Sequence, residues 1–301
     1  MENVDAFKDI LGNFDVNTGI NSSVIICTVI GILTVIASFV VFLVFIRKRH
    51  KGTFFTYIGG VSTALLFYVT GGSISNVILN LFPKSASSST AVCIITAVIV
   101  SSLMAWGGRL IAIKLFERRM DKISSSFSMG LGIMTVEAIS KIITLFANLI
   151  IFYTINDLGC KELLNRANGQ DDFVTTLDLL KETQAITGTQ MIVAAVVTII
   201  FMLFHIAMSV PMFAAFKKQI SKVHLAICYG VFVLIETLIY MNNYKIINQA
   251  VYVALLILLA VGFILYVMRI YNEYYKAEAF EKQQKDEEHK KMPRFGNLSN
   301  L

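Results

Sequence analysis

The sequence predicts an all-α, polytopic membrane protein with about seven transmembrane helices. Apolar stretches recur along most of the chain, and each approaches or exceeds the roughly 20 residues that an α-helix needs to cross a bilayer. The chain is 56% hydrophobic and 15% charged, whereas a soluble domain carries about 25% charged residues. The few ionisable residues inside the apolar stretches therefore carry most of the functional information.

The apolar stretches define the predicted spans in chain order. Their limits fall at residues 21–46, 54–82, 91–116, 125–154, 190–216, 223–241 and 250–270. The second and fourth spans are longer than a bilayer requires. Tilt, or a kink at Gly71-Gly72 or at Gly130 and Gly132, would accommodate the extra length.

Basic residues decide the predicted orientation. Lys and Arg gather after the first, third and fifth spans and in the tail, at 47–51, 118–122, 217–222 and 269–294. The positive-inside rule then places the N-terminus outside and the C-terminus in the cytoplasm, and an odd number of spans agrees. The predicted parts are an extracytoplasmic segment 1–20, a transmembrane domain 21–270 that contains an extracytoplasmic loop 155–189, and a charged cytoplasmic tail 271–301.

The parts outside the membrane carry weaker patterns. Segment 1–20 has apolar residues at helical spacing and several acids, which predicts either a helix lying on the outer membrane surface or a loose tail. Loop 155–189 is net acidic, with a helical pattern over 171–182, and is either a connector or a cap over the mouth of a cavity. Residues 272–291 predict a charged, solvated helix.

Several classes of function are excluded by what the sequence lacks. The net charge of +6 follows the membrane pattern and does not indicate nucleic-acid binding. No P-loop, GxSxG, HExxH or CxxC motif occurs. A zinc site needs three or four ligands, and only Glu137 and His205 lie centrally in the spans. We therefore predict no metal and no cofactor.

Arg109, Glu137 and Lys141 are ionisable residues within spans. A charge at a helix centre in a bilayer costs roughly 2.5–3.5 kcal/mol on insertion scales, so such groups face a protein interior or a wet cavity. Glu137 and Lys141 are four residues apart and share a helix face, either as a self-neutralising pair or as part of a site. Arg109 either points inward or extends along the helix to the cytoplasmic face.

His205 lies in the middle of the fifth span, and Ser209 is one turn further on the same face. Pro211 loosens the backbone just after them. This arrangement is typical of a cavity wall. Glu236, in the outer half of the sixth span, is interpreted as lying near the membrane interface. The predicted cavity residues are Arg109, Glu137, Lys141, His205 and Ser209.

Three short motifs resemble a known family. They are Trp106-Gly107-Gly108-Arg109-Leu110, the stretch from Ser128 to Ile139 (SMGLGIMTVEAI), and His205-Ile206-Ala207-Met208-Ser209. They resemble the YhfC family of bacterial membrane proteins, which is similar to the glutamic-type intramembrane proteases of the CAAX-processing and bacteriocin-immunity group. The family pattern is Glu-Glu-x-Gly-Arg in span three, Gly-x-Gly-His-Gly-Gly-x-Glu in span four and His-x-x-x-Ser in span five, with another His later. The resemblance implies a bacterial cytoplasmic membrane protein.

The chain departs from that pattern where the chemistry needs it most. Ala105 and Trp106 stand where the family has its paired glutamates, and Ile133 stands in place of the span-four His. A peptidase of this type needs a carboxylate to take a proton from water, and neither Ala nor Trp accepts one. The resemblance therefore implies a pseudoenzyme on a protease scaffold.

Three functions follow as hypotheses. The first is a non-catalytic protein that binds a membrane-embedded peptide, lipid or partner subunit in the former active-site cavity. The second is a divergent intramembrane peptidase that uses Glu137 as base and His205 and Arg109 as partners. The third is a transporter or transporter accessory subunit with a polar site at the bilayer midplane. The expected partners are the lipid bilayer and another membrane protein or peptide, with no nucleic acid.

Overall fold

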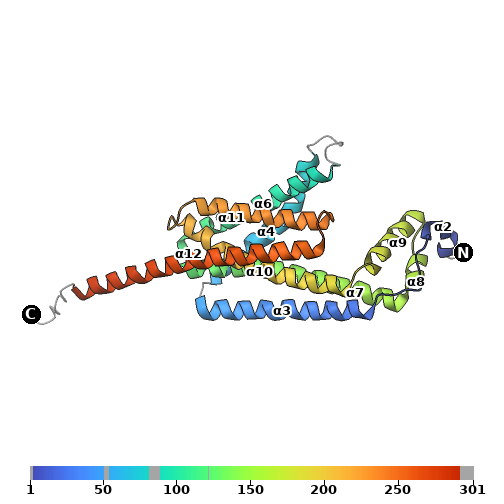
Figure 1. The fold of residues 1–301 in the computed structure, drawn as a ribbon, viewed down its shortest axis with the longest axis horizontal. Coiled ribbons are helices and arrows are strands. Elements are labelled where there is room, and N and C mark those ends of the chain that lie inside the picture. The colour runs from blue at the N-terminus through green and yellow to red at the C-terminus, as the bar shows by residue number, and fades with distance from the viewer. Residues whose placement is uncertain (1–2, 51–53, 81–88, 121, 292–301) are drawn as a thin grey trace, which may run out of the picture.

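A computed structural model describes residues 3–50, 54–80, 89–120 and 122–291, and the elements in these ranges are helices (Figure 1). The elements are α1 (Asn3–Ala6), α2 (Lys8–Leu11), α3 (Ser22–His50), α4 (Phe54–Asn80), α6 (Thr90–Leu115), the 3₁₀ turn η1 (Glu117–Arg119), α7 (Ile123–Leu158), α8 (Cys160–Asn165), α9 (Gln170–Gln184), α10 (Gly188–Phe216), α11 (Val223–Asn243) and α12 (Gln249–Lys291). The seven long helices α3, α4, α6, α7, α10, α11 and α12 coincide with the predicted spans to within a few residues, except that α12 continues about twenty residues beyond its predicted span. The all-α prediction is confirmed.

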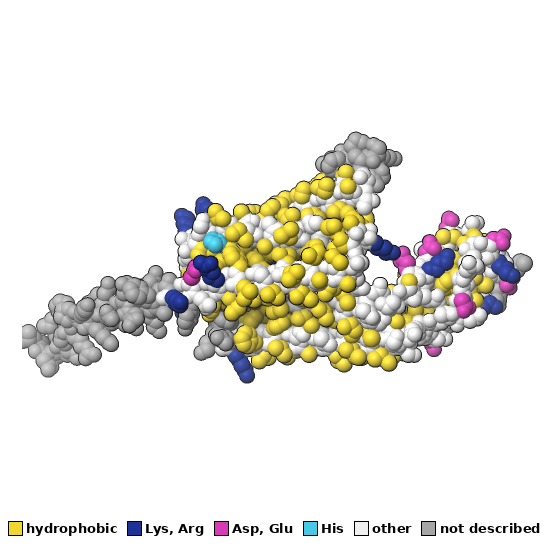
Figure 2. Space-filling model, viewed as in Figure 1, with side chains coloured by type: hydrophobic (Ala, Val, Ile, Leu, Met, Phe, Trp, Pro, Cys, Tyr) yellow, Lys and Arg dark blue, Asp and Glu magenta, His cyan; other side chains and the backbone are white. Residues whose placement is uncertain are grey.

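The bundle has the surface of a membrane protein. Hydrophobic side chains form a broad band over the long helices, while charged side chains gather beyond its two ends (Figure 2). Six of the long helices are apolar enough over their described residues to cross a membrane, and α4 contributes a shorter apolar stretch, Phe54–Phe67. Lys51 and residues 292–301 of the predicted tail lie outside the described residues.

Helix α10 is the centre of the bundle. It packs against α3, α6, α7, α11 and α12. In its most apolar window 56% of the residues are buried, against 22–33% in the other spanning helices. A capping box fixes its start: the Thr187 hydroxyl accepts from the Gln190 backbone N–H, and the Gln190 side chain accepts from the Thr187 N–H. Side chains on α10 are therefore held at fixed heights in the bundle.

Glycines let α7 approach its neighbours closely. A Cβ atom on Gly132 would lie 2.1 Å from the backbone oxygen of Tyr57, and one on Gly60 would lie 2.2 Å from the backbone oxygen of Met129. The Tyr57 hydroxyl and the Thr135 hydroxyl, 3.1 Å apart, join the same two helices. Gly132 thus serves close packing of α7 on α4, as small residues commonly do between membrane helices.

Segment 3–20 folds against loop 155–189, and together they form a small helical arm at one end of the bundle (Figure 1). The Asn3 side chain donates to the backbone oxygens of Asn165 and Ala167, at 3.0 and 2.6 Å. The Phe7 and Phe173 rings lie 5.0 Å apart. The predicted alternatives for segment 1–20, a membrane-surface helix or a loose tail, are therefore both wrong for its described residues, because the apolar residues pack on α8 and α9.

The join between the arm and the bundle depends on Asn156, near the end of α7. Its side chain accepts from the Ile20 N–H at 2.6 Å and donates to the Ile20 oxygen at 3.0 Å. Nearby, Gln184 donates to the Thr18 oxygen at 2.5 Å. The Cys160 thiol is buried beside Gln184, and burial raises the pKa of this thiol, so it remains protonated and unreactive.

We expect Asn156→Ala to release the N-terminal segment. The substitution leaves the buried Ile20 N–H without its partner, which lowers the free energy of local opening by about 1–3 kcal/mol. Limited proteolysis of the purified protein, with mass spectrometry of the N-terminal fragments, should show faster cleavage before residue 22. The exposed Asn13→Ala variant is the matched control, and equal cleavage in the two variants would contradict the role of Asn156.

Candidate functional site

A cavity of about 430 Å³ lies among α7, α10, α11 and α12, with α6 contributing at its inner end. The ionisable residues that line it are Glu137 and Lys141 from α7, His205 from α10 and Glu236 from α11. Toward the end of the bundle that carries the arm, the lining includes five carboxamides: Asn148, Gln190, Asn242, Asn243 and Gln249. The volume is within the range of about 300–1,000 Å³ that is typical of small-molecule sites.

Arg109 lies behind His205 and is not part of the cavity lining, which corrects its prediction as a cavity residue. One guanidinium nitrogen (Nη1) donates to the Ala105 oxygen at 2.8 Å, and the other (Nη2) is hydrogen-bonded to His205 Nδ1. The guanidinium also lies over the Phe232 ring, 4.7 Å from its centroid. Because a guanidinium only donates, Nδ1 accepts, and the His205 ring is neutral with its proton on Nε2. Among the described residues, no hydrogen bond reaches Nε2, so this N–H is available to a ligand in the cavity.

The position of Arg109 settles the alternatives left open by the sequence. The residue is only 2% exposed, so it points inward and does not extend to the membrane surface. Its Nε atom is buried without a hydrogen-bond partner, and no carboxylate of the described residues forms an ion pair with it. An arginine held in this way is costly in a bilayer, which indicates a functional rather than a packing role.

Glu137 and Lys141 form only a loose pair. Their closest nitrogen–oxygen distance is 4.0 Å, and the Lys141 side chain is 46% exposed against 20% for Glu137. The two residues share a face of α7 as their spacing predicts. At this distance the lysine screens the carboxylate but does not occupy it with a short hydrogen bond.

Glu236 is the site residue that sequence reasoning missed. The sequence placed it near the membrane interface, whereas the structure places it in the wall of the cavity, with Phe232 and Ile239 on the same face of α11. The i, i+4, i+7 spacing of these three residues was the available signal. It was not decisive because the sequence does not show which face of α11 meets α7 across the cavity.

Ser209 does not line the cavity. It is fully buried, and its hydroxyl donates to the His205 oxygen at 3.1 Å. Gly130 of α7 packs at this turn, where a Cβ atom would lie 2.9 Å from the His205 oxygen and from the Ser209 hydroxyl. The sequence predicted a cavity-wall serine, so this is a correction. Ser209 and Gly130 instead pack at the turn of α10 that carries His205 and so fix the position of His205 along the bundle axis.

The positions where the resemblance expects paired glutamates face different ways. Ala105 lines the cavity. Trp106 is turned toward α11, where its indole N–H donates to the Leu225 oxygen at 3.0 Å and its ring meets the edge of Tyr229. A carboxylate at position 105 would have entered the cavity, and Glu236 supplies one from another helix.

Within the described ranges, no three His, Cys, Asp or Glu side chains lie close enough together to hold a metal ion. The donors that do meet in the cavity are two carboxylates and a histidine whose Nδ1 is taken by Arg109. This donor set suits hydrogen bonding and charge pairing with an organic ligand better than metal coordination.

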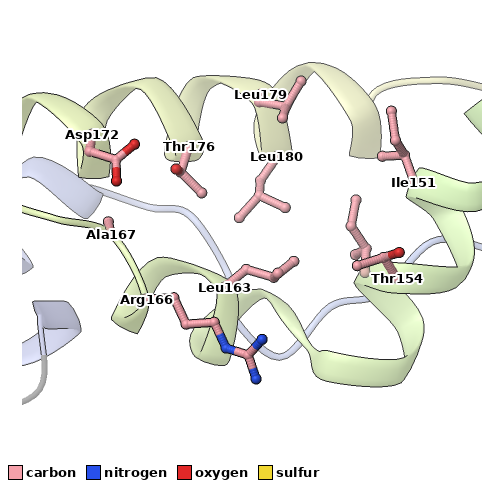
Figure 3. A pocket seen from close by; sticks show the side chains of 10 residues that line it. Ile151, Thr154, Leu163, Arg166, Ala167, Asp172, Thr176, Leu179 and Leu180 are labelled. Atoms are coloured by element: carbon pink, nitrogen blue, oxygen red, sulfur yellow. The ribbon is translucent and has the colours of Figure 1, made fainter. Parts of the chain in front are cut away.

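A second hollow, of about 340 Å³, lies in the arm between α9, α8 and the end of α7 (Figure 3). Its interior is apolar, with Leu163 and Leu180 prominent, and the Arg166 guanidinium points away from them. Arg166 pairs with Glu162 at 3.0 Å, and Asp172 accepts from the Asn168 N–H at 2.8 Å. These two charged groups at the rim are thus already satisfied within the arm, whereas Glu236 in the larger cavity has no hydrogen-bond or ion-pair partner among the described residues.

Comparison of the chain with protein-family models, with curated proteins and with solved structures finds no match.

Proposed function

We propose that this chain is a multi-pass protein of the bacterial cytoplasmic membrane that binds a membrane-embedded peptide, lipid or partner segment in the cavity. The single observation that carries the proposal is the meeting of Glu137, Lys141, His205 and Glu236 in one cavity of about 430 Å³. Ionisable groups at membrane depth are retained chiefly for function. From the three sequence motifs we also propose that the chain is a degenerate member of the YhfC-type protease family.

The lining supports ligand binding in two further ways. Aromatic and aliphatic side chains, among them Phe201, Phe204 and Ile235, cover the wall between the ionisable groups. The carboxamides at the arm end both donate and accept, as is required to pair with peptide groups. A mainly apolar wall with a few convergent polar groups is the usual composition of a ligand site.

Site-specific photocrosslinking tests the proposal. A benzoylphenylalanine at Phe201, which lines the cavity, should yield a discrete adduct when cells are irradiated and the protein is analysed by mass spectrometry. The matched control is Val196 on the same helix, which is 37% exposed and does not line the cavity. If Phe201 gave only the bulk phospholipids that Val196 gives, the proposal would fail.

A residual peptidase is the second candidate, because two carboxylates and a histidine donor line the same cavity. In that reaction Glu137 takes a proton from water, the water oxygen attacks the amide carbon, and the proton passes to the leaving nitrogen while His205 Nε2–H donates to the oxyanion. Peptide cleavage lost in both Glu137→Gln and His205→Ala, with folding intact, would establish this activity. Cleavage unchanged in both variants would assign it to a contaminant.

We also propose that the arm is extracytoplasmic and the end of α12 cytoplasmic. In a background with the four cysteines replaced, a membrane-impermeant maleimide added to intact cells should label Asp178→Cys on α9. It should label Lys276→Cys on α12 only after permeabilisation. Both native residues are exposed. The reverse pattern of labelling would invert the orientation given by the basic residues.

A further inference from the structure

The charges that face the membrane cavity do not balance. Its lining holds two carboxylates, Glu137 and Glu236, and one ammonium group, Lys141. His205 is neutral because its Nδ1 accepts from Arg109. From α6 the cavity receives Ala105, and from α12 it receives Gln249 and Tyr252, none of which carries a charge at neutral pH. With both carboxylates ionised, the lining carries one negative charge in excess; the Arg109 guanidinium lies behind His205 and does not line the cavity.

Glu236 is the carboxylate left over. Lys141 lies 4.0 Å from Glu137, and no ion pair or hydrogen bond of the described residues reaches Glu236. Glu236 nevertheless lies within electrostatic range of both Glu137 and Lys141. A carboxylate held among apolar walls is unfavourable unless a cation or hydrogen-bond donors compensate it. When Glu236 is ionised, the partner that it lacks is a positive group that donates hydrogen bonds.

The walls around Glu236 define what such a group is attached to. Phe232, Ile235 and Ile239 of α11 flank it, and Phe201 and Val197 of α10 line the same cavity. An aromatic and aliphatic wall suits an apolar body, and the aromatic faces also favour a nearby cation. A strongly hydrated small ion would gain little from this wall.

The cavity also offers hydrogen-bond donors and acceptors to a ligand. His205 Nε2–H at the inner end and the carboxamides of Asn148, Asn242, Asn243 and Gln249 at the arm end offer hydrogen bonds to amide or ester groups of a ligand. A primary ammonium has three N–H donors, which is enough to hydrogen-bond to more than one carboxylate. The cavity therefore provides for a cationic head, an apolar body and polar linkages in one molecule.

We infer that the occupant is an amphiphile with a primary ammonium group that lies between Glu137 and Glu236, with its apolar part against Phe201 and Phe232. The inference rests on the proposed function of the cavity. Two sources share this chemistry: the amino end of a hydrophobic peptide and the headgroup of an aminolipid.

Binding of a matched pair of probes tests the charge requirement. The protein in phosphatidylcholine nanodiscs is titrated with leucyl-phenylalanine amide, which carries a primary ammonium, and with its N-acetylated form, which does not. Because a charge-assisted hydrogen bond is lost on acetylation, we expect about 10- to 100-fold tighter binding of the free amine. Equal affinities would overturn the inference, and so would the absence of binding by either probe.

Two substitutions should act in opposite directions. Glu236→Gln should reduce the preference for the free amine by about tenfold, whereas Lys141→Met, which removes the competing cation, should increase affinity for it. Asp178→Asn, an acid-to-amide change on the exposed face of α9, is the matched control and should change nothing. Should Glu236→Gln fail to fold, Lys141→Met alone decides, since unchanged or weaker binding there contradicts the inference.

The lipid composition of the nanodisc distinguishes the two sources of the ammonium. The Phe201 crosslink distinguishes failure of the ammonium inference from failure of the proposed function. Replacing phosphatidylcholine with phosphatidylethanolamine should weaken peptide binding if the aminolipid occupies the cavity, and should leave it unchanged if a peptide amine is the occupant. A discrete Phe201 adduct together with equal affinity for the two probes would keep the cavity as a binding site and reject the ammonium. The absence of that adduct would reject the proposed function itself.

Discussion

Replacing Arg109 with Met is expected to make the protein more stable and its cavity less ordered. The guanidinium is 2% exposed, lacks an ion-pair partner among the described carboxylates and leaves Nε without a hydrogen bond. Replacing buried ion pairs with apolar side chains of similar size has stabilised other proteins by about 1–4 kcal/mol, and removal of Arg109 leaves no paired carboxylate behind. Thermal unfolding in detergent should show a rise of several degrees. We expect this stabilisation because Arg109 costs stability in the native protein, where its role is to fix the tautomer of His205.

The same variant should change the state of His205. In the native protein Nδ1 accepts from Arg109, so ¹⁵N NMR of the ring should report one tautomer, with the proton on Nε2. In Arg109→Met both neutral tautomers should be populated. Arg118→Met, at an exposed arginine in η1, is the matched control and should alter neither measurement. A large loss of stability in Arg109→Met would instead assign Arg109 a structural role.

The second large effect is expected at Gly132. A Cβ atom there would lie 2.1 Å from the Tyr57 backbone oxygen and 2.9 Å from the Val61 backbone nitrogen, and backbone atoms cannot rotate away. Gly132→Val should therefore separate α7 from α4 and destabilise the protein by on the order of 3 kcal/mol or more. Reduced yield of folded protein and a lower unfolding temperature are the measurements.

Gly230 provides the control for Gly132. It lies in α11, and a Cβ atom there would meet nothing within 4 Å. Because both positions are helical, Gly230→Val carries the same change in helix propensity without the steric conflict. Similar destabilisation in the two variants would show that the loss arises from the valine itself and not from the contact between α4 and α7.

The helices could be predicted well from the sequence because length and hydrophobicity determine them directly. The predicted span 190–216 and the observed Gly188–Phe216 differ by two residues at one end and coincide at the other. The packing of segment 3–20 could not be predicted in this way. Its attachment depends on single side chains such as Asn156 that contact residues more than a hundred positions away in the chain.

The candidate site was predicted where the pattern of a single helix contained the information. Glu137 and Lys141 share a face of α7 because of their spacing, His205 is the ionisable residue in the middle of α10, and the structure has all three in the cavity wall. Glu236 and Ser209 were misplaced because their positions depend on the rotation of α11 and α10 about their axes. That rotation is set by contacts such as Gly130 against the turn at His205, which no local pattern reveals.

The length of helix α12 connects the cavity to a distant part of the chain. It contributes Gln249 and Tyr252 to the cavity at its first turn and continues as one helix to Lys291. At 1.5 Å per residue such a rod is about 60 Å long. A small tilt of its first turn on occupation of the cavity would therefore be magnified at its far end, where the charged residues lie. Occupancy of the cavity at one end of α12 would in this way be transmitted as a displacement of the other end of the helix.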